Sequence, residues 1–218
     1  MKTDHTGITL AAYNKNADKY ADKFMAFKSY QEKLSRFQQR YLPEHASILD
    51  VGCGPGNTAK FLMGIDNHYT ITGIDLSVEM ITIARQNVPG CNFSIQDIRD
   101  IIPDKEYDAV IASFCIVHLS DQETTVLIQT LSKMLKPNGS LYISFMEGKS
   151  PGLETTSFSD EKIFFNYFPR DRIKGLLAAN SVETVELLVE GYPEQDGSIT
   201  KDIFVFARKR YALTPGIS

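Results

Sequence analysis

The sequence predicts an α/β fold: a doubly wound, mostly parallel seven-stranded sheet with an antiparallel hairpin at one edge and a helical N-terminal segment. Three observations predict it. From Ser47 onward, short apolar runs alternate with helical patterns, which is typical of βα units. A glycine-rich turn follows the first of these runs. Two β-like runs, 182–189 and 202–207, are joined by the loop 191–197, which indicates a hairpin at the edge of the sheet.

Five apolar runs are the expected parallel strands: 47–51, 69–74, 91–95, 107–112 and 140–145. The first is followed by a helix from Asn57, and the second by a helix that Ser77 caps. On that second helix one face is expected to hold Met80, Ile83, Ala84 and Asn87. The alternation of these strands with helices predicts a sheet that helices cover on both faces.

The clearest helix start is Ser120-Asp121-Gln122-Glu123, a capping box in which the first and last side chains satisfy each other's backbone donors. The buried stripe of this helix is expected to be Val126, Leu127, Thr130, Leu131 and Met134, and Pro137-Asn138-Gly139 then turns the chain into the fifth strand. A later helix begins near Pro169 and ends near Asn180, with Ile173, Leu176 and Leu177 facing inward. Residues 12–42 are predicted to form two helices.

Composition and charge narrow the function. The chain has 218 residues, 43% hydrophobic and 23% charged, and a net charge of −4. This is an ordinary globular balance, and its acidity disfavours a nucleic-acid partner. The three cysteines, Cys53, Cys91 and Cys115, form no C-x-x-C pair, so we expect no metal site and a reducing, cytoplasmic environment. No apolar run approaches the roughly 20 residues of a membrane span, so we expect no membrane partner.

The turn after the first strand reads Asp50-Val51-Gly52-Cys53-Gly54-Pro55-Gly56 and lies where open α/β sheets bind ligands. Alternate glycines let the backbone approach a ligand closely, whereas a bare turn needs only one. The dinucleotide fingerprint is G-x-G-x-x-G, which differs from the G-x-G-x-G spacing found here. Asp50 would repel a diphosphate and attract an ammonium group. We therefore expect a ligand with a positive group and regard a dehydrogenase as remote.

Two more acids follow strand ends. Asp75, after the second strand, can accept both hydroxyls of a ribose, or it can simply favour the N-terminus of the next helix. Asp97, followed by Ile98 after the third strand, can accept from an exocyclic amine beside an apolar face. A nucleoside that carries an amino-acid ammonium describes S-adenosylmethionine.

With these motifs the chain resembles the class I S-adenosylmethionine-dependent methyltransferases, which have a Rossmann-like fold. The resemblance covers roughly residues 46–145. It rests on the segments 48–56, 73–77, 96–98, 107–113 and 135–141, in the order and spacing of that family.

The resemblance implies a role for each matching residue. Asp50 and the turn that contains Gly52, Cys53, Gly54 and Gly56 would hold the methionine part. Asp75 would bind the ribose, Leu76 and Met80 would flank the purine, and Asp97 and Ile98 would bind adenine. The carbonyl of Ser113 would approach the ammonium. The resemblance also implies an N-terminal helix that closes over the cofactor, for which Tyr13 and Tyr20 are the candidates; ordinary packing is the alternative for both.

We therefore expect an N-terminal helical lid at 1–46, a methyltransferase domain at 47–210 with a pocket insertion at 146–168, and a tail at 211–218. Tyr13 and the aromatic residues of the insertion, Phe165 and Tyr167 among them, would meet the acceptor; the alternative for the insertion is that its aromatic residues form core. His118, beyond the fourth strand, is the candidate general base, with helix capping or packing as the alternative. Cys115 follows Phe114 and not the proline of cytosine-C5 enzymes, so we interpret it as a structural thiol.

The predicted function is S-adenosylmethionine-dependent transfer of a methyl group to a small molecule, by in-line displacement. Amino-methyltransferases of DNA and many of RNA have an Asn/Asp-Pro-Pro-aromatic loop where this chain has Ser113-Phe114-Cys115-Ile116. Two alternatives stay open: a protein or RNA methyltransferase, and a non-catalytic module that binds the cofactor. The acceptor and the oligomeric state are not predicted.

Overall fold

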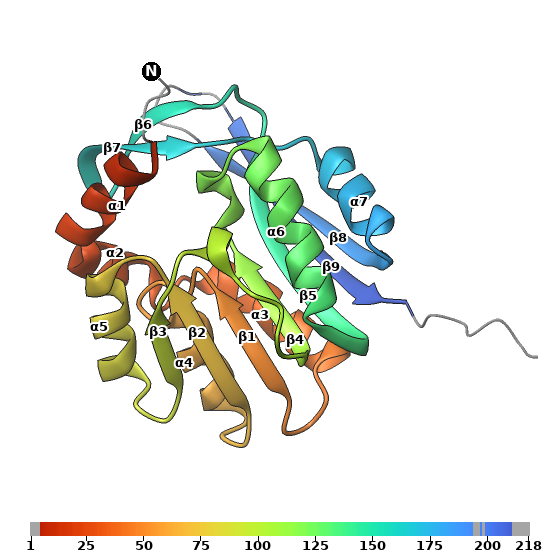
Figure 1. Cartoon of the computed structure of the whole chain (residues 1–218). Helices are drawn as coiled ribbons and strands as arrows, with labels where there is room; N and C mark the ends of the chain where they lie inside the picture. Colours follow the sequence, from red (N-terminus) through yellow and green to blue (C-terminus); the bar gives the residue numbers. More distant parts are fainter. Residues whose placement is uncertain (1–4, 194–196, 198, 211–218) are drawn as a thin grey trace, which may run out of the picture.

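The computed structural model describes residues 5–193, 197 and 199–210, and a seven-stranded sheet lies at its centre (Figure 1). Its strand order is β3-β2-β1-β4-β5-β9-β8. Strands β1 to β5 are parallel, whereas β9 is antiparallel to both β5 and β8. The predicted fold class is therefore confirmed. The strands are β1 (Ser47–Val51), β2 (Thr70–Asp75), β3 (Asn92–Ile95), β4 (Tyr107–Ser113), β5 (Leu135–Glu147), β8 (Val182–Pro193) and β9 (Ile199–Lys209).

Helices cover both faces of the sheet, because successive strand residues point to opposite faces. On β1, Ile48 packs into the core formed with α3, α4 and α5, and Leu49 packs into the core formed with α6 and α7. Figure 1 shows α6 and α7 on the near face of the sheet. The helices are α3 (Lys28–Tyr41), α4 (Asn57–Ile65), α5 (Val78–Asn87), α6 (Asp121–Lys133) and α7 (Arg170–Ala179).

The N-terminal segment holds three helices, α1 (His5–Lys15), α2 (Ala17–Phe24) and α3, so the prediction of two helices in residues 12–42 is wrong in number. Asn16 separates the first two, because its buried side-chain amide donates to the Ala12 carbonyl and to Ser159 Oγ, 143 residues away. A contact so distant in sequence leaves no local signal. Helices α1 and α2 lie at the carboxyl ends of the strands, and α3 packs its Leu34 and Phe37 against the sheet.

The insertion expected at 146–168 contains a two-stranded antiparallel sheet, β6 (Gly152–Thr156) and β7 (Ser159–Phe165), which the sequence did not predict. This hairpin lies against α1 (Figure 1). Strand β5 is also longer than expected. Pro137, Asn138 and Gly139 form an irregular bulge within it, since Tyr107 pairs with Leu135 and Ala109 pairs with Ser140.

Helix ends were predicted better than helix faces. The capping box at Ser120 and Glu123 is confirmed, and so is the Ser77 cap, whose hydroxyl accepts from the Met80 amide. Within α6, however, Val126 is 50% exposed. Leu127, Leu131 and Met134 are buried as predicted, and Thr124 and Ile128 complete the buried face.

The tail 211–218 and residues 194–196 of the predicted loop lie outside the described residues. Among the residues that are described, none of the helices combines the length and the hydropathy needed to cross a membrane. The same ranges contain no group of three or more His, Cys, Asp or Glu side chains arranged to hold a metal ion.

Candidate active site

The turn between β1 and α4 crosses the carboxyl ends of the central strands, and glycine is required at its first position. Gly52 has a φ of +66°, and a Cβ there would come within 2.5 Å of the Cys115 Cβ. Gly54 has a φ of +53°, and Gly56 begins α4 with a φ of +83°. Residues with a side chain rarely adopt these φ angles, so glycine occupies the turn. Because glycine has no Cβ, a ligand can approach the backbone of the turn closely.

Asp50 is the next-to-last residue of β1 and is only 1% exposed. Among the described residues, its Oδ2 atom is buried and has no hydrogen-bond partner. Burial, with the negative charge of Asp75 as a second cause, raises the pKa of Asp50 to about 8. A buried polar atom without a partner is uncommon in a folded protein and calls for an explanation. A cation beside this oxygen would supply the missing partner.

Asp75, at the end of β2, lies next to the turn. Its two carboxylate oxygens accept hydrogen bonds from the Gly54 and Ser77 amides, each at 2.9 Å. Burial raises the pKa of Asp75, and these hydrogen bonds oppose the increase. The carboxylate is therefore held in one position, with one oxygen attached to the glycine turn and the other to the start of α5.

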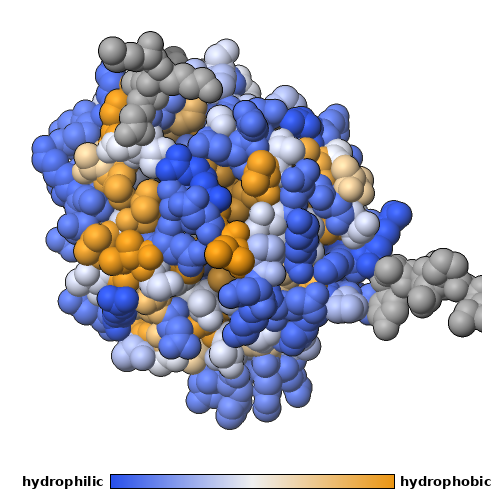
Figure 2. All heavy atoms as spheres, viewed as in Figure 1, coloured by the Kyte–Doolittle hydropathy of each residue, from blue (hydrophilic) through white to orange (hydrophobic). Residues whose placement is uncertain are grey.

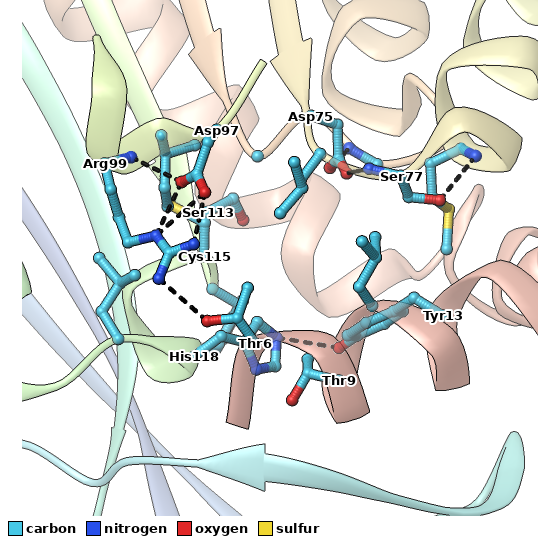
Figure 3. A pocket seen from close by; sticks show the side chains of 18 of the residues that line it. Thr6, Thr9, Tyr13, Asp75, Ser77, Asp97, Arg99, Ser113, Cys115 and His118 are labelled. Carbon is cyan, nitrogen blue, oxygen red and sulfur yellow. Dashed lines mark hydrogen bonds and ion pairs between the residues drawn. The ribbon is translucent and has the colours of Figure 1, made fainter. Parts of the chain in front are cut away.

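A cavity lies between this turn and α1 (Figure 3). Its wall on the sheet side comes from the ends of β1, β2, β4 and the short helix η1 (Ile98–Asp100), and its other wall comes from α1. Figure 3 shows Asp75 and Asp97 on the sheet side, with Thr6 and Tyr13 across the cavity on α1. Outside the cavity, apolar side chains gather where α1 meets α5 (Figure 2), and Ile8 and Val78 on these helices are 38% and 50% exposed.

Asp97 has a partner that the sequence analysis missed. The Arg99 Nε donates to both of its oxygens at 3.0 Å, and Nη2 lies 2.5 Å from Oδ2. The side-chain hydrogen bond from Arg99 lowers the pKa of Asp97. Arg99 Nη1 also donates to Thr6 Oγ1 on α1 at 3.1 Å and to Glu123 Oε1 on α6 at 3.2 Å. Arg99 therefore keeps Asp97 ionised and connects α1 to the core.

His118, in the short helix η2 (Ile116–His118), lies between α1 and the hairpin. Its Nδ1 is 2.8 Å from the Phe164 carbonyl, which can only accept, so Nδ1 carries the proton. The other ring nitrogen, Nε2, therefore accepts the hydrogen bond from the Tyr13 hydroxyl at 3.0 Å (Figure 3). Burial lowers the pKa of His118 to about 4. The ring is neutral at physiological pH, and its one free lone pair faces Tyr13.

Further contacts fasten α1 to the hairpin. The Phe164 amide donates to Thr9 Oγ1 at 3.1 Å, and the His5 ring stacks on the Phe164 ring with a centroid distance of 4.4 Å. Farther along, Asn16 donates to Glu161 Oε2 at 2.8 Å, and Lys15 forms an ion pair with the same carboxylate. The α1 helix and β7 therefore form one connected wall.

A second cavity, of about 550 Å³, lies on the other side of α2. Tyr13, Tyr20 and Phe114 line both cavities, so they form the partition between them. Phe114 has a φ of +52°, a strained angle for a residue with a side chain, and its amide donates to the Ser144 carbonyl and hydroxyl. The remaining aromatic side chains around this cavity are Phe24, Tyr30, Phe158, Phe165 and Tyr167.

Residues 48–139 match the sequence model of a family described as "Methyltransferase domain". A trans-aconitate 2-methyltransferase of Variovorax paradoxus is 30% identical over 129 residues, which cover 56% of this chain and 49% of that protein. Phosphoethanolamine N-methyltransferase 1 of Arabidopsis thaliana is 32% identical over 138 residues, which cover 61% of this chain and 26% of that protein. Over residues 48–139 the chain is therefore similar to the class I S-adenosylmethionine-dependent methyltransferases.

Solved methyltransferase structures have the same fold. The structure described as "DhpI-SAH complex structure" superposes with a TM-score of 0.74 at 18% identity and covers 97% of this chain and 100% of that one. A 1,6-didemethyltoxoflavin-N1-methyltransferase of Burkholderia thailandensis gives a TM-score of 0.70 at 17% identity, covering 96% and 91%. The chain spans about half the length, or less, of the curated relatives it matches, so its own activity is a matter for proposal.

Most residues predicted at the cofactor site line the first cavity: Tyr20, Gly52, Gly54, Asp75, Leu76, Met80, Asp97, Ile98 and Ser113. Asp50, Cys53 and Gly56 lie behind its wall. The Cys53 side chain is 2% exposed and packs beside Gly73, and a Cβ on Gly56 would touch Ala84 at 3.3 Å. These two positions therefore shape the turn and do not line the cavity.

The residues predicted to meet the acceptor also come together. Tyr13, Phe165 and Tyr167 line the second cavity, and His118 lines the first, beside Tyr13. Thr6, Thr9 and Arg99 also line the first cavity and were not predicted from the sequence. Only Arg99 left a signal that could have been used, because an arginine two residues after a strand-end aspartate can reach back to that carboxylate. The two threonines lie before the segment where a helix was expected.

Proposed function

We propose that this methyltransferase transfers a methyl group from S-adenosylmethionine to a small-molecule acceptor. The observation that carries the proposal is the buried Asp50 oxygen, which lies next to the glycine turn and to Asp75 and has no hydrogen-bond partner among the residues that the structure describes. A carboxylate in that place suits a ligand with an ammonium group and not a diphosphate. The second, larger cavity on the other side of the partition supplies room for an acceptor.

The residues of the first cavity, together with Asp50 behind its wall, suit the parts of this cofactor. Asp50 and the backbone of Gly52 and Gly54 would hold the methionine part, and the Asp75 carboxylate would accept the ribose hydroxyls. Asp97, which Arg99 keeps ionised, would accept from the adenine amine. Leu76, Met80 and Ile98 offer apolar faces for the purine ring.

S-adenosylmethionine, when bound, supplies a methyl group on a positively charged sulfur. The task of the protein is then to exclude water and to align the acceptor. Tyr13, Tyr20 and Phe114 are the residues in place for this task, because they separate the two cavities. Burial raises the pKa of both tyrosines, so their hydroxyls stay protonated at physiological pH.

Tyr13 and His118 would also move the acceptor's proton. Because Tyr13 donates its own hydrogen to His118 Nε2, its oxygen keeps lone pairs free to accept from an acceptor O–H or N–H. As the acceptor proton passes to Tyr13, the Tyr13 proton passes to His118. The imidazolium would be held by the Phe164 carbonyl through Nδ1–H. An acceptor that arrives without a proton needs no such step.

The lid must open for the cofactor to enter. With α1 fastened, the first cavity encloses about 140 Å³, whereas small-molecule pockets usually enclose about 300–1,000 Å³. Opening breaks the contacts of Thr6 with Arg99 and of Tyr13 with His118. Both pairs lie at the face of α1 that points into the cavity (Figure 3).

The size of the second cavity, about 550 Å³, favours a small molecule over a protein or RNA chain. The cavity lies under α2 and the β6–β7 hairpin, and its aromatic walls suit a compact apolar body. Several relatives are described by small-molecule names, among them a trans-aconitate 2-methyltransferase, and this agrees with the proposal.

Titration calorimetry with S-adenosylhomocysteine and NADH tests the cofactor, and incubation of S-adenosylmethionine with metabolite extracts, followed by mass detection of methylated products, tests the reaction. We expect binding of the first ligand only, and a mass increase of one methyl group in at least one metabolite. Binding of NADH without S-adenosylhomocysteine would overturn the proposal. Binding of S-adenosylhomocysteine without any methylated product would favour a non-catalytic module.

A further inference from the structure

The second cavity contains charged side chains that the proposed function has not used. Three lysines line it, each from a different segment: Lys23 on α2, Lys149 after β5 and Lys162 on β7. Two carboxylates, Glu154 and Asp202, line it as well. Which of these charges is already neutralised within the protein decides what the cavity can bind.

Both carboxylates are engaged. Glu154 accepts from the Tyr167 hydroxyl at 3.0 Å and forms an ion pair with Lys149 at 3.5 Å. Asp202 is 4% exposed, and its Oδ2 accepts from the Tyr30 hydroxyl at 3.1 Å. A cationic acceptor would therefore have to compete with partners that these acids already have.

The other two lysines have no carboxylate partner within the described part of the chain. Lys23 donates to the neutral Ser157 hydroxyl and lies 5.0 Å from the Phe24 ring centroid. It is half-buried, and burial lowers its pKa, so a negative charge nearby would stabilise it. Lys162 is exposed at the cavity and has no ion pair in the described ranges.

From this balance we infer that the methyl acceptor is an anion, a carboxylate or a phosphate on an apolar or aromatic body, whose charged group is held between Lys23 and Lys162. This assignment rests on the proposed function. Lys23 and Lys162, which have no carboxylate partner in the described ranges, bind the anionic group, and the eight aromatic side chains of the wall contact the body. Tyr13, Tyr20 and Phe114 then set the distance between this body and the cofactor cavity.

The test measures the affinity of four ring compounds for the full chain saturated with S-adenosylhomocysteine: benzoate, phenyl phosphate, benzyl alcohol and benzylamine. We expect benzoate, phenyl phosphate or both to bind at least about tenfold more tightly than the neutral and cationic compounds, since a hydrogen bond to a charged group contributes at least that much. Tighter binding of benzoate indicates a carboxylate on the acceptor, and tighter binding of phenyl phosphate indicates a phosphate.

Two variants, Lys23→Met and Lys162→Met, test the residues. Each is expected to weaken the favoured anion by about tenfold while the affinities for benzyl alcohol and S-adenosylhomocysteine stay the same. Lys60→Met is the control, because it makes the same change on α4, outside both cavities.

Benzylamine or benzyl alcohol binding as tightly as the anions overturns the inference, and so does wild-type anion affinity in both lysine variants or a failure of all four compounds to bind. None of these results affects the cofactor. A chain that does not bind S-adenosylhomocysteine overturns the proposed function, and the anionic acceptor with it.

Discussion

Replacing Asp50 by asparagine removes a buried charge and tests why that charge is there. Burial and Asp75 raise the pKa of Asp50 from 3.8 to about 8. A group whose pKa is raised by folding stabilises the folded state at low pH, and this contribution is lost as the pH rises toward the folded-state value. Without ligand, the wild-type protein should therefore lose stability between pH 5 and pH 8, and the asparagine variant should not lose this part.

The magnitude follows from the pKa. Each pH unit in this window costs about 1.4 kcal/mol, so three units cost about 4 kcal/mol. For a chain of this length, 1 kcal/mol corresponds to about 2–4 °C in Tm. Thermal unfolding without ligand should show the Tm of Asp50→Asn rising relative to wild type by about 8–16 °C from pH 5 to pH 8.

Ligand affinity should move in the opposite direction. Breaking a buried ion pair by removing one partner costs about 3 kcal/mol or more, so calorimetry at pH 8 should show S-adenosylhomocysteine binding weakened by about 100-fold. Asp104→Asn, an exposed carboxylate outside both cavities, is the control and should change neither quantity. The reasoning would be refuted if the Tm of Asp50→Asn and the Tm of wild type changed equally between pH 5 and pH 8 and the affinity for S-adenosylhomocysteine were unchanged.

Three further predictions concern the lid and the turn. Tyr13→Phe removes the hydrogen bond to His118 and should lower kcat for a protonated acceptor at least about tenfold, with S-adenosylhomocysteine affinity nearly unchanged; equal losses in both would indicate a packing role. Burial lowers the pKa of His118 from 6.5 to about 4, so its contribution to the free energy of unfolding is present above pH 6.5 and is lost as the pH falls toward 4. The loss is about 3 kcal/mol in all. Urea unfolding at several pH values should show this loss in wild type and not in His118→Asn. Gly52→Ala strains a φ of +66° and brings a Cβ within 2.5 Å of Cys115, which should cost about 2–4 kcal/mol in thermal unfolding, whereas Gly64→Ala, with open space around it in α4, should be neutral or stabilising.

The parts of the site on parallel strands could be predicted from the sequence. The carboxyl ends of such strands meet at one edge of the sheet, so Asp50, Asp75 and Asp97 were expected near each other without any distance being known. The glycine spacing between Asp50 and α4 then indicated a close approach of backbone and ligand. These signals are local, and they depend only on the order of strands and helices.

The lid could not be predicted in the same detail, because its contacts join residues distant in sequence. Arg99 and Thr6 are 93 residues apart, and His118 and Phe164 are 46 apart. The interruption at Asn16 depends on Ser159, and no periodicity in residues 12–42 could reveal it. The sequence shows that residue 118 is a histidine, whose ordinary pKa near 6.5 indicated a base at neutral pH. The low pKa of His118 follows from its burial in the folded chain.

The attachment of α1 to β7 has a consequence for the order of steps. One carbonyl and one amide of Phe164 hold His118 and Thr9, which line the first cavity, and the neighbouring Phe165 lines the second, so α1 and β7 form a wall that the two cavities share. Under the proposed function, an acceptor bound in the second cavity would keep α1 from lifting away from the first cavity. Steady-state kinetics should therefore be ordered: the cofactor enters first, the methylated product departs next, and S-adenosylhomocysteine is released last.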